Sequence, residues 1–365
     1  MRRAIIEEQR KVNGRPALAV LPIHHPKEIL TAMGVLAVEL WGPPGAPRSA
    51  HAGRLQTYVC AVARNALAFL ESDGAEAVDG VLVPHTCDAL QGLGSLLTDL
   101  GVKARPCLTF THPRGADRPS LRRFLRAELQ ALATRLEVLG VPPLAPERLA
   151  WAVSLHQVID DLRGQLLDRR ACFPGDDAEL YAVLRRGEYL WPEDHLAELR
   201  RAAARLRPEP VQRLAPVLVT GIVPEPAALL PFLATAGMYV AADDWAAVGR
   251  RVARRSPPRA ADPWDDVVER YLALPPCSTR TADTASRVAH LVGLATRSGA
   301  RGVILHSMKF CEPELFDLPA IRRAFAERGL PVLELETELE AELPGQAVTR
   351  LEAFGEMLAD QRRPA

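Results

Sequence analysis

A strand–helix–strand pattern occurs twice in this chain, and this internal repeat limits the possible folds more than any other feature of the sequence. Residues 17–42 read ALAVLPIHHPKEILTAMGVLAVELWG, and residues 217–244 read VLVTGIVPEPAALLPFLATAGMYVAADD. In each copy an apolar strand precedes a short helix, which begins at a proline (Pro26 or Pro226) and ends at a glycine. Strand, helix and strand joined by short loops predict parallel strands connected by right-handed crossovers.

The repeat continues further along the chain. Residues 77–88 read AVDGVLVPHTCD, and residues 299–312 read GARGVILHSMKFCE. Both segments contain a run of apolar strand formers, followed by a cysteine and then an acidic residue. An amphipathic helix is expected before each copy, around 54–72 and around 281–298. The pattern therefore predicts an α/β fold with two similar Rossmann-like (flavodoxin-like) domains, each built on an open parallel sheet.

The domain organisation follows from where the repeat is interrupted. We expect a first α/β domain with an N-terminal helix over residues 1–115 and a second α/β domain over residues 209–365. Between them, residues 116–208 show apolar side chains at three- and four-residue spacing, which predicts an inserted helical region.

Length and charge narrow the class of protein. A chain of 365 residues, 48% of them hydrophobic, is long enough for two domains. Lys+Arg and Asp+Glu number 45 each, so charge gives no reason to expect nucleic acid or an anionic membrane as a partner. The N-terminus has no apolar stretch of the signal-peptide type, and prolines interrupt the most apolar region, residues 214–242. We expect a soluble, cytoplasmic protein with reduced thiols.

Two cysteines follow equivalent strands of the repeat. Cys87 and Cys311 each come just after an apolar strand, and ligands of open α/β sheets bind outside the carboxyl ends of the strands. If the two domains face each other, both thiols point into one cleft. Cys60 lies near the start of a predicted helix, where free N–H groups favour a thiolate. One interpretation is therefore a metal site shared by Cys60, Cys87 and Cys311.

Other interpretations of the cysteines remain open at this point. Free cysteines often fill protein cores, and the absence of a CxxC pair removes the usual spacing signal of zinc and ferredoxin sites. The same fold could bind zinc or no metal. Cys277, in LPPCSTR, is a candidate for an extra ligand, with a simple loop thiol as the alternative. Cys107 and Cys172 are interpreted as structural.

Several segments resemble the 2-hydroxyacyl-CoA dehydratase (component D) and benzoyl-CoA reductase subunit family. The C-terminal pieces are GVILHSMKFCEPE, GLPVLELETELE and PGQAVTRLEAFGEML. Earlier pieces are PKEILTAMG, DGVLVPHTCD, DDWAAVGR and DPWDDVVERYL. The resemblance extends from about residue 15 to residue 360. It implies two Rossmann-like domains with added helices, in agreement with the repeat.

The resemblance also implies a cofactor, partners and a reaction. By position, Cys60, Cys87 and Cys311 correspond to the cysteines that hold a [4Fe-4S] cluster in this family. Members pair two related subunits, so a heterodimer with a second subunit or a homodimer is expected, with an ATP-dependent activator protein as electron donor. The implied reaction removes water from a (R)-2-hydroxyacyl-CoA through a ketyl radical.

Alternatives within the family stay open. The chain could be a subunit of a benzoyl-CoA type reductase, a double-cubane small-molecule reductase or a non-catalytic partner subunit. Trp245 stands where a cysteine is often expected, and CSTRTAD around Cys277 lacks the fuller cysteine motif of double-cubane members.

Four further residues are candidates because they lie near a cysteine in sequence. His85, His306 and Lys309 are candidate catalytic groups, since histidine suits proton transfer near neutral pH. Arg64, one turn after Cys60, is a candidate for binding the cofactor or a phosphate. The alternative for the histidines and Lys309 is that they make ordinary hydrogen bonds at strand ends.

Overall fold

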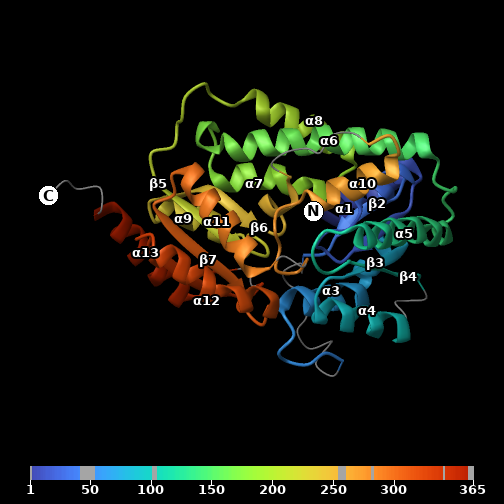
Figure 1. The fold of residues 1–365 in the computed structure, drawn as a ribbon, viewed down its shortest axis with the longest axis horizontal. Helices are drawn as coiled ribbons and strands as arrows, with labels where there is room; N and C mark the ends of the chain where they lie inside the picture. The colour runs from blue at the N-terminus through green and yellow to red at the C-terminus, as the bar shows by residue number, and fades with distance from the viewer. Residues whose placement is uncertain are drawn as a thin grey trace.

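The molecule is built around two parallel sheets that lie side by side in the computed structural model (Figure 1). The structure describes residues 2–41, 54–100, 105–253, 260–280, 283–339 and 342–360. Each sheet has four strands, and neighbouring strands pair in parallel throughout both sheets. The predicted α/β fold with two Rossmann-like domains is thereby confirmed.

The first sheet has the strand order β2-β1-β3-β4. Its strands are β1 (Ala17–Val20), β2 (Leu36–Glu39), β3 (Gly80–His85) and β4 (Cys107–Thr111). The chain runs from β1 to β2 on one side and later returns to place β3 on the other side of β1. The strand order therefore reverses between β1 and β3, and the crevice beyond their carboxyl ends is the usual ligand position in such a sheet.

Alternating side chains of the first sheet pack against helices on both faces. Leu18 and Val20 face a core that includes α2, α5, α6 (Pro146–Asp168) and α10 (Pro263–Leu272), whereas Ala17 and Ala19 face a core that includes α1, α3 and α4. The helices on this half are α1 (Arg2–Asn13), α2 (Lys27–Ala32), α3 (Ala61–Glu71), α4 (Asp88–Leu100) and α5 (Pro119–Leu136). Burial on both faces explains why these strands are continuously apolar in sequence.

The second sheet repeats this topology with the order β6-β5-β7-β8. Its strands are β5 (Ala215–Gly221), β6 (Met238–Trp245), β7 (Gly302–Met308) and β8 (Val332–Thr337). One face is covered by α11 (Thr284–Ser298) and α12 (Glu312–Ala326). The other face packs against helices of the same half and of the inserted region, including α9 (Leu229–Thr235) and α13 (Gly345–Asp360). Here the strand order reverses between β5 and β7.

The inserted region bridges the two halves. Its helices α6 (Pro146–Asp168), α7 (Asp177–Arg185) and α8 (Pro192–Ala204) follow α5. In Figure 1, α6 runs along the top of both sheets, and α8 packs against α6. Short 3-10 turns connect these and other elements: η2 (Asp73–Ala77), η3 (Glu137–Leu139), η4 (Arg170–Cys172), η5 (Arg186–Glu188) and η6 (Gly249–Arg251). The inserted helices are as predicted, while the exact domain limits at 115 and 208 stay predictions.

One helix of the second half returns to the first. Helix α10 (Pro263–Leu272) packs against α5 and α6, and its Val267 and Val268 belong to the core of the first sheet. A buried ion pair also joins the halves, since Arg251 donates to both carboxylate oxygens of Glu39 at 2.7 and 2.8 Å. The two sheets are therefore held together by apolar packing and by charge.

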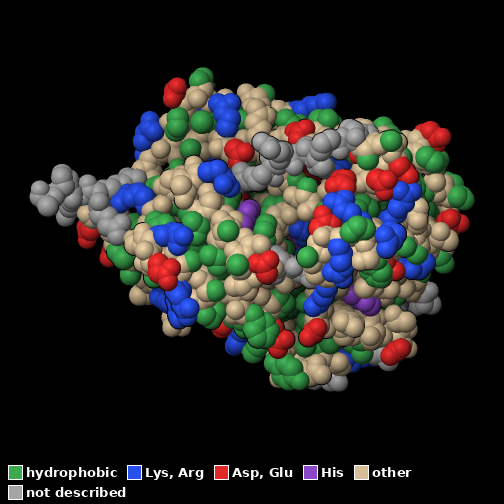
Figure 2. Space-filling view, in the orientation of Figure 1, with side chains coloured by type: hydrophobic (Ala, Val, Ile, Leu, Met, Phe, Trp, Pro, Cys, Tyr) green, Lys and Arg blue, Asp and Glu red, His purple; other side chains and the backbone are tan. Residues whose placement is uncertain are grey.

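The surface carries both signs of charge. In Figure 2, basic and acidic side chains are interspersed over the visible face. None of the helices in the described part of the chain combines the length and hydropathy that a bilayer-spanning segment requires.

Candidate functional site

Three cysteines stand at the beginnings of three helices. Cys60 is the N-cap residue of α3, Cys311 is the N-cap residue of α12, and Cys87 directly precedes Asp88, the first residue of α4. The first turn of a helix has backbone N–H groups without intrahelical partners, and these groups favour negative charge. Three helix N-termini from both halves of the molecule thus each present a thiol.

The three thiols line the same cavity. Its volume is about 500 Å³, and its wall includes Cys60, Cys87, Cys311 and Ser278. The rest of the wall combines apolar side chains, among them Phe316, which is 81% exposed, with charged ones such as Arg114. The cavity therefore lies between the two halves, beyond the strand ends where the repeat predicted a common cleft.

Burial controls the protonation of these thiols in the protein alone. Burial raises the pKa of Cys87 to about 11 and also raises the pKa of Cys60. The pKa of Cys311 lies well above its usual value because of burial and the neighbouring charges of Cys60, Glu314 and Cys87. The thiols are close enough to influence one another, and a cation in the cavity would favour their thiolate form.

Backbone groups already favour negative charge at each sulfur. Hydrogen bonds from Ala63 and Val62 lower the pKa of Cys60, and those from Leu90 and Ala89 act in the same way on Cys87. Glu314 contributes the corresponding backbone hydrogen bond to Cys311. N–H groups directed at sulfur are the interactions that tune iron–sulfur clusters.

The donor set consists of three thiols at the starts of three separate helices. Within the described residues, no group of three or more His, Cys, Asp and Glu side chains could hold one metal ion. A cubane instead takes each thiolate on a different iron, so its ligands stand further apart around one cavity. Three thiols on separate helices around a cavity of about 500 Å³ fit this group. Their role as ligands stays a prediction.

Arg64 and Lys309 meet at one carboxylate. Arg64 Nη2 lies 3.0 Å from Glu338 Oε2, and Lys309 Nζ lies 3.5 Å from Glu338 Oε1. Glu338 thereby connects the helix that follows Cys60 with the segment that leads into Cys311. Neither basic residue lines the cysteine cavity. Arg64 makes a contact between the halves, whereas Lys309 and Glu338 both belong to the second half.

The two candidate histidines also lie outside the wall of the cysteine cavity. His306 is buried within β7, where its Nδ1 accepts from Trp245 Nε1 at 3.3 Å and its Nε2 lies 2.7 Å from Thr337 Oγ1. Burial lowers its pKa to about 4, so the ring is neutral at pH 7. His85 packs against Gly94 and lines a neighbouring groove with Arg114. A catalytic role for either stays a prediction.

Cys277 has a different environment from the other three candidate thiols. Its sulfur lies 3.4 Å from Arg250 Nη1 and 3.0 Å from Thr279 Oγ1, and its side chain is fully buried. The next residue, Ser278, lines the cysteine cavity, whereas Cys277 does not. In this conformation the thiol belongs to a polar network around Arg250, and the extra-ligand role stays a prediction.

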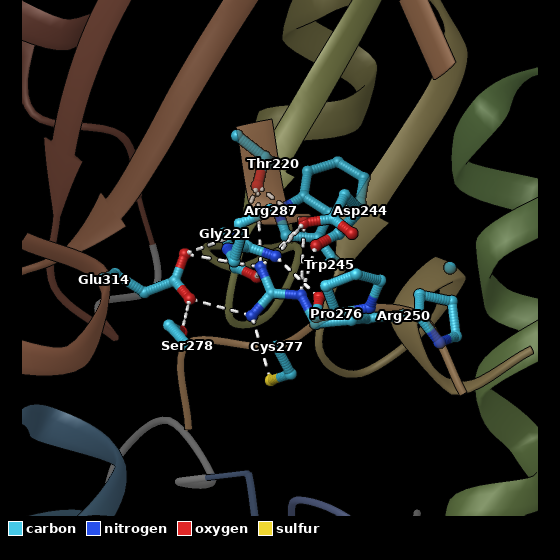
Figure 3. A network of polar contacts seen from close by, with 12 residues as sticks. Thr220, Gly221, Asp244, Trp245, Arg250, Pro276, Cys277, Ser278, Arg287 and Glu314 are labelled. Carbon is cyan, nitrogen blue, oxygen red and sulfur yellow. Dashed lines mark hydrogen bonds and ion pairs between the residues drawn. The ribbon is translucent and has the colours of Figure 1, made fainter. Parts of the chain in front are cut away.

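That network brings two arginines and two carboxylates together (Figure 3). Arg250 donates to Asp244 at 2.9 Å and to Glu314 at 2.8 Å, and Arg287 donates to Asp244 at 2.8 Å. Arg250, Arg287 and Asp244 are fully buried. Although burial alone would raise it, the two arginines hold the pKa of Asp244 far below its usual range.

Glu314 and Ser278 are two residues of the site to which sequence reasoning gave no role. Glu314 stands three residues after Cys311, and Ser278 directly follows Cys277. Two features of the sequence could have indicated a buried polar network. One is a charged residue, Glu314, within the first turn of the helix that follows Cys311, and the other is the presence of charged residues at the end of an apolar strand. These signals mark buried charge, but they do not identify the partners.

The fold and the site define a class: two facing Rossmann-like domains with a thiol-lined cavity between their strand ends. The family model described as 2-hydroxyglutaryl-CoA dehydratase, D-component, matches residues 22–358, and the chain belongs to that family. The family resemblance inferred from sequence is thus confirmed.

Curated relatives match over nearly their whole length. The chain is 26% identical over 359 residues to lactoyl-CoA dehydratase subunit beta of Anaerotignum propionicum, covering 97% of this chain and 94% of that protein. It is 24% identical to the (R)-phenyllactyl-CoA dehydratase beta subunit of Clostridium sporogenes, covering 94% and 92%. It is also 24% identical to a benzoyl-CoA reductase subunit of Thauera aromatica, covering 88% and 85%.

Proposed function

We propose that this chain is the iron–sulfur subunit of a radical 2-hydroxyacyl-CoA dehydratase, with Cys60, Cys87 and Cys311 as ligands of a [4Fe-4S] cluster. The observation that carries the proposal is the convergence of three helix N-termini, each with a cysteine, on one cavity between the halves. The overall reaction removes water from a (R)-2-hydroxyacyl-CoA. When bound, the cluster supplies single-electron transfer and one iron without a protein thiolate.

The residues of the chain contribute binding, charge stabilisation and exclusion of water. The N–H groups at the starts of α3, α4 and α12 stabilise negative charge on the sulfurs. Apolar side chains such as Leu93 and Leu96 line the cavity and keep its dielectric constant low, which strengthens every charge interaction inside it. Arg114, which also lines the cavity, is available to an anionic ligand.

Partners are part of the proposal. Two dehydratase relatives are named as beta subunits, which supports assembly with a second, related subunit. An ATP-dependent activator protein would supply the low-potential electron, and the acyl-CoA thioester would be the substrate. A homodimer is the alternative assembly.

Iron analysis tests the ligand assignment directly. After anaerobic purification and reconstitution we expect about four iron and four sulfide per chain and an electron paramagnetic resonance signal on reduction. Cys87→Ala should lower the iron content and alter the signal. Cys172→Ala is the matched control, because that buried thiol lies in η4 and does not line the cavity. A colourless, iron-free wild-type protein after reconstitution would refute the proposal.

A reductase subunit is the second candidate. It is favoured by the similarity to the benzoyl-CoA reductase subunit of Thauera aromatica. Counting electrons distinguishes the two, since a dehydratase needs electrons only catalytically and a reductase consumes them in proportion to product. If the assembled enzyme kept its activity after Cys87→Ala had removed this subunit's cluster, the chain would be a non-catalytic partner. A double-cubane reductase would bind about twice the iron per chain.

A further inference from the structure

We propose that Ser278 recognises an O–H group inside the cysteine cavity, acting as a hydrogen-bond acceptor that Glu314 holds in place. This inference deepens the proposed function and rests on it for the identity of the ligand. The O–H group belongs either to the 2-hydroxyl of a hydroxyacyl thioester or to a water molecule.

The first step is the direction of the hydrogen bond between the two residues. Ser278 lines the cavity, and its Oγ donates its single hydrogen to Glu314 Oε1 (Figure 3). An ionised carboxylate only accepts hydrogen bonds, whereas a hydroxyl has one hydrogen and two lone pairs. With its hydrogen bound to Glu314, Ser278 can offer only lone pairs to a ligand. It therefore selects donors.

The second step is that Glu314 is ionised although it is 6% exposed. Arg250 Nη1 lies 2.8 Å from Glu314 Oε1, and Arg287 Nη2 lies 3.5 Å from Glu314 Oε2. Two guanidinium groups on one carboxylate favour its charged, accepting form, so Ser278 is the donor in this contact.

The third step is that the two residues directly before Ser278 are anchored. The carbonyl of Pro276 accepts from Arg287 Nη1 at 3.1 Å, and the Cys277 thiol contacts Arg250. Arg250 is itself bound to the carbonyl of Gly221 at 3.0 Å, at the end of β5. Anchoring of this kind preorganises a recognising group, so less free energy is lost when a ligand binds.

The chemical consequence is discrimination between thioesters with and without a hydroxyl. A thioester that carries the hydroxyl satisfies the lone pairs of Ser278. An analogue that lacks the hydroxyl leaves this acceptor unpaired after water has been displaced, which weakens its binding.

The test compares two thioesters on the anaerobically reconstituted full chain. We expect (R)-lactoyl-CoA to bind roughly five- to tenfold more tightly than propanoyl-CoA, the range of a typical net hydrogen bond. Ser278→Ala should abolish this preference, because the variant neither accepts a hydrogen bond from (R)-lactoyl-CoA nor leaves an unpaired acceptor beside propanoyl-CoA, whose binding should tighten. Ser278→Thr, which keeps the hydroxyl, should retain the preference, and Glu314→Gln, which no longer fixes the direction of the hydrogen bond, should weaken it.

A second arm identifies water as the source of the O–H group. If Ser278 binds water beside the cluster, ¹⁷O-enriched water should broaden the resonance signal of the reduced wild-type protein, and Ser278→Ala should remove the broadening. The proposal is overturned if Ser278→Ala changes neither the thioester preference nor the broadening, or if the wild type shows neither effect. The comparison of the two thioesters can be made without a cluster. Iron-free wild-type protein would therefore contradict the proposed function without contradicting the role of Ser278.

Discussion

The guanidinium of Arg64 lies 3.0 Å from the carboxylate of Glu338 and joins the two halves of the molecule beside the cysteine cavity. Arg64 is one turn after Cys60 in α3, and Glu338 follows the last residue of β8. The pair is partly exposed, with side-chain exposures of 31% and 24%. The pair links the two halves beside the cavity that they share. Because the pair is partly exposed to solvent, its contribution to stability is small.

For this pair we expect a small effect on stability. Arg64→Ala should lower the free energy of unfolding by no more than about 1 kcal/mol, because solvent screens partly exposed ion pairs. Urea denaturation of Arg64→Ala, Glu338→Gln and the double variant measures the coupling between the two residues. Arg322→Ala, which removes an ion pair of 3.2 Å within the second half, is the matched control. A loss above about 3 kcal/mol would contradict the exposed geometry.

The buried pair of Glu39 and Arg251 should behave differently. Glu39→Gln leaves the Arg251 guanidinium buried without its charged partner, so we expect a loss of about 3 kcal/mol or more at pH 7. Glu334→Gln is the control, since its partner Arg322 is exposed. If both variants lost the same free energy of unfolding in urea denaturation, the contact between the halves would stabilise the fold no more than a surface ion pair does.

The same carboxylate predicts a loss of stability in acid. Burial alone would raise the pKa of Glu39, but Arg251 lowers it to about 2, below the unfolded value of about 4.3. Because the folded pKa is the lower one, the contribution is complete above pH ~4.3 and is lost as the pH falls toward 2. The shift corresponds to about 3 kcal/mol. Denaturation at pH 7, 4 and 2.5 should therefore show the wild type and Glu39→Gln converging in acid, and a constant difference would argue against this assignment.

Much of this architecture could be predicted because it depends on local pattern. The two apolar strands that precede Cys87 and Cys311 are long, continuous and followed by helix signals, so both the sheets and the cysteine positions follow from sequence periodicity. The cavity between the halves also follows, because ligands of such sheets bind beyond the strand ends.

The remaining features depend on distant contacts or on irregular loops. Arg250 and Glu314 are 64 residues apart, and no local pattern specifies that their side chains meet. Cys277 and Ser278 are neighbours in a loop without regular alternation, so the sequence could not tell which of them faces the cavity. Helix α10 falls in the second half by its position in the chain, yet its apolar face packs on the first.

The last prediction concerns the arginine at the centre of the buried network. Arg250→Met keeps an apolar stem of similar length but removes the charge that Asp244 and Glu314 share. Both carboxylates are buried, and Arg287 would be the remaining guanidinium to neutralise them, with His290 beside Asp244. We therefore expect a loss of about 3–5 kcal/mol at pH 7, measured by urea denaturation. Arg322→Met, at an exposed position, should change stability by less than about 0.5 kcal/mol. If Arg250→Met lowered the free energy of unfolding no more than this control does, the stability of the fold would not depend on neutralising the two buried carboxylates.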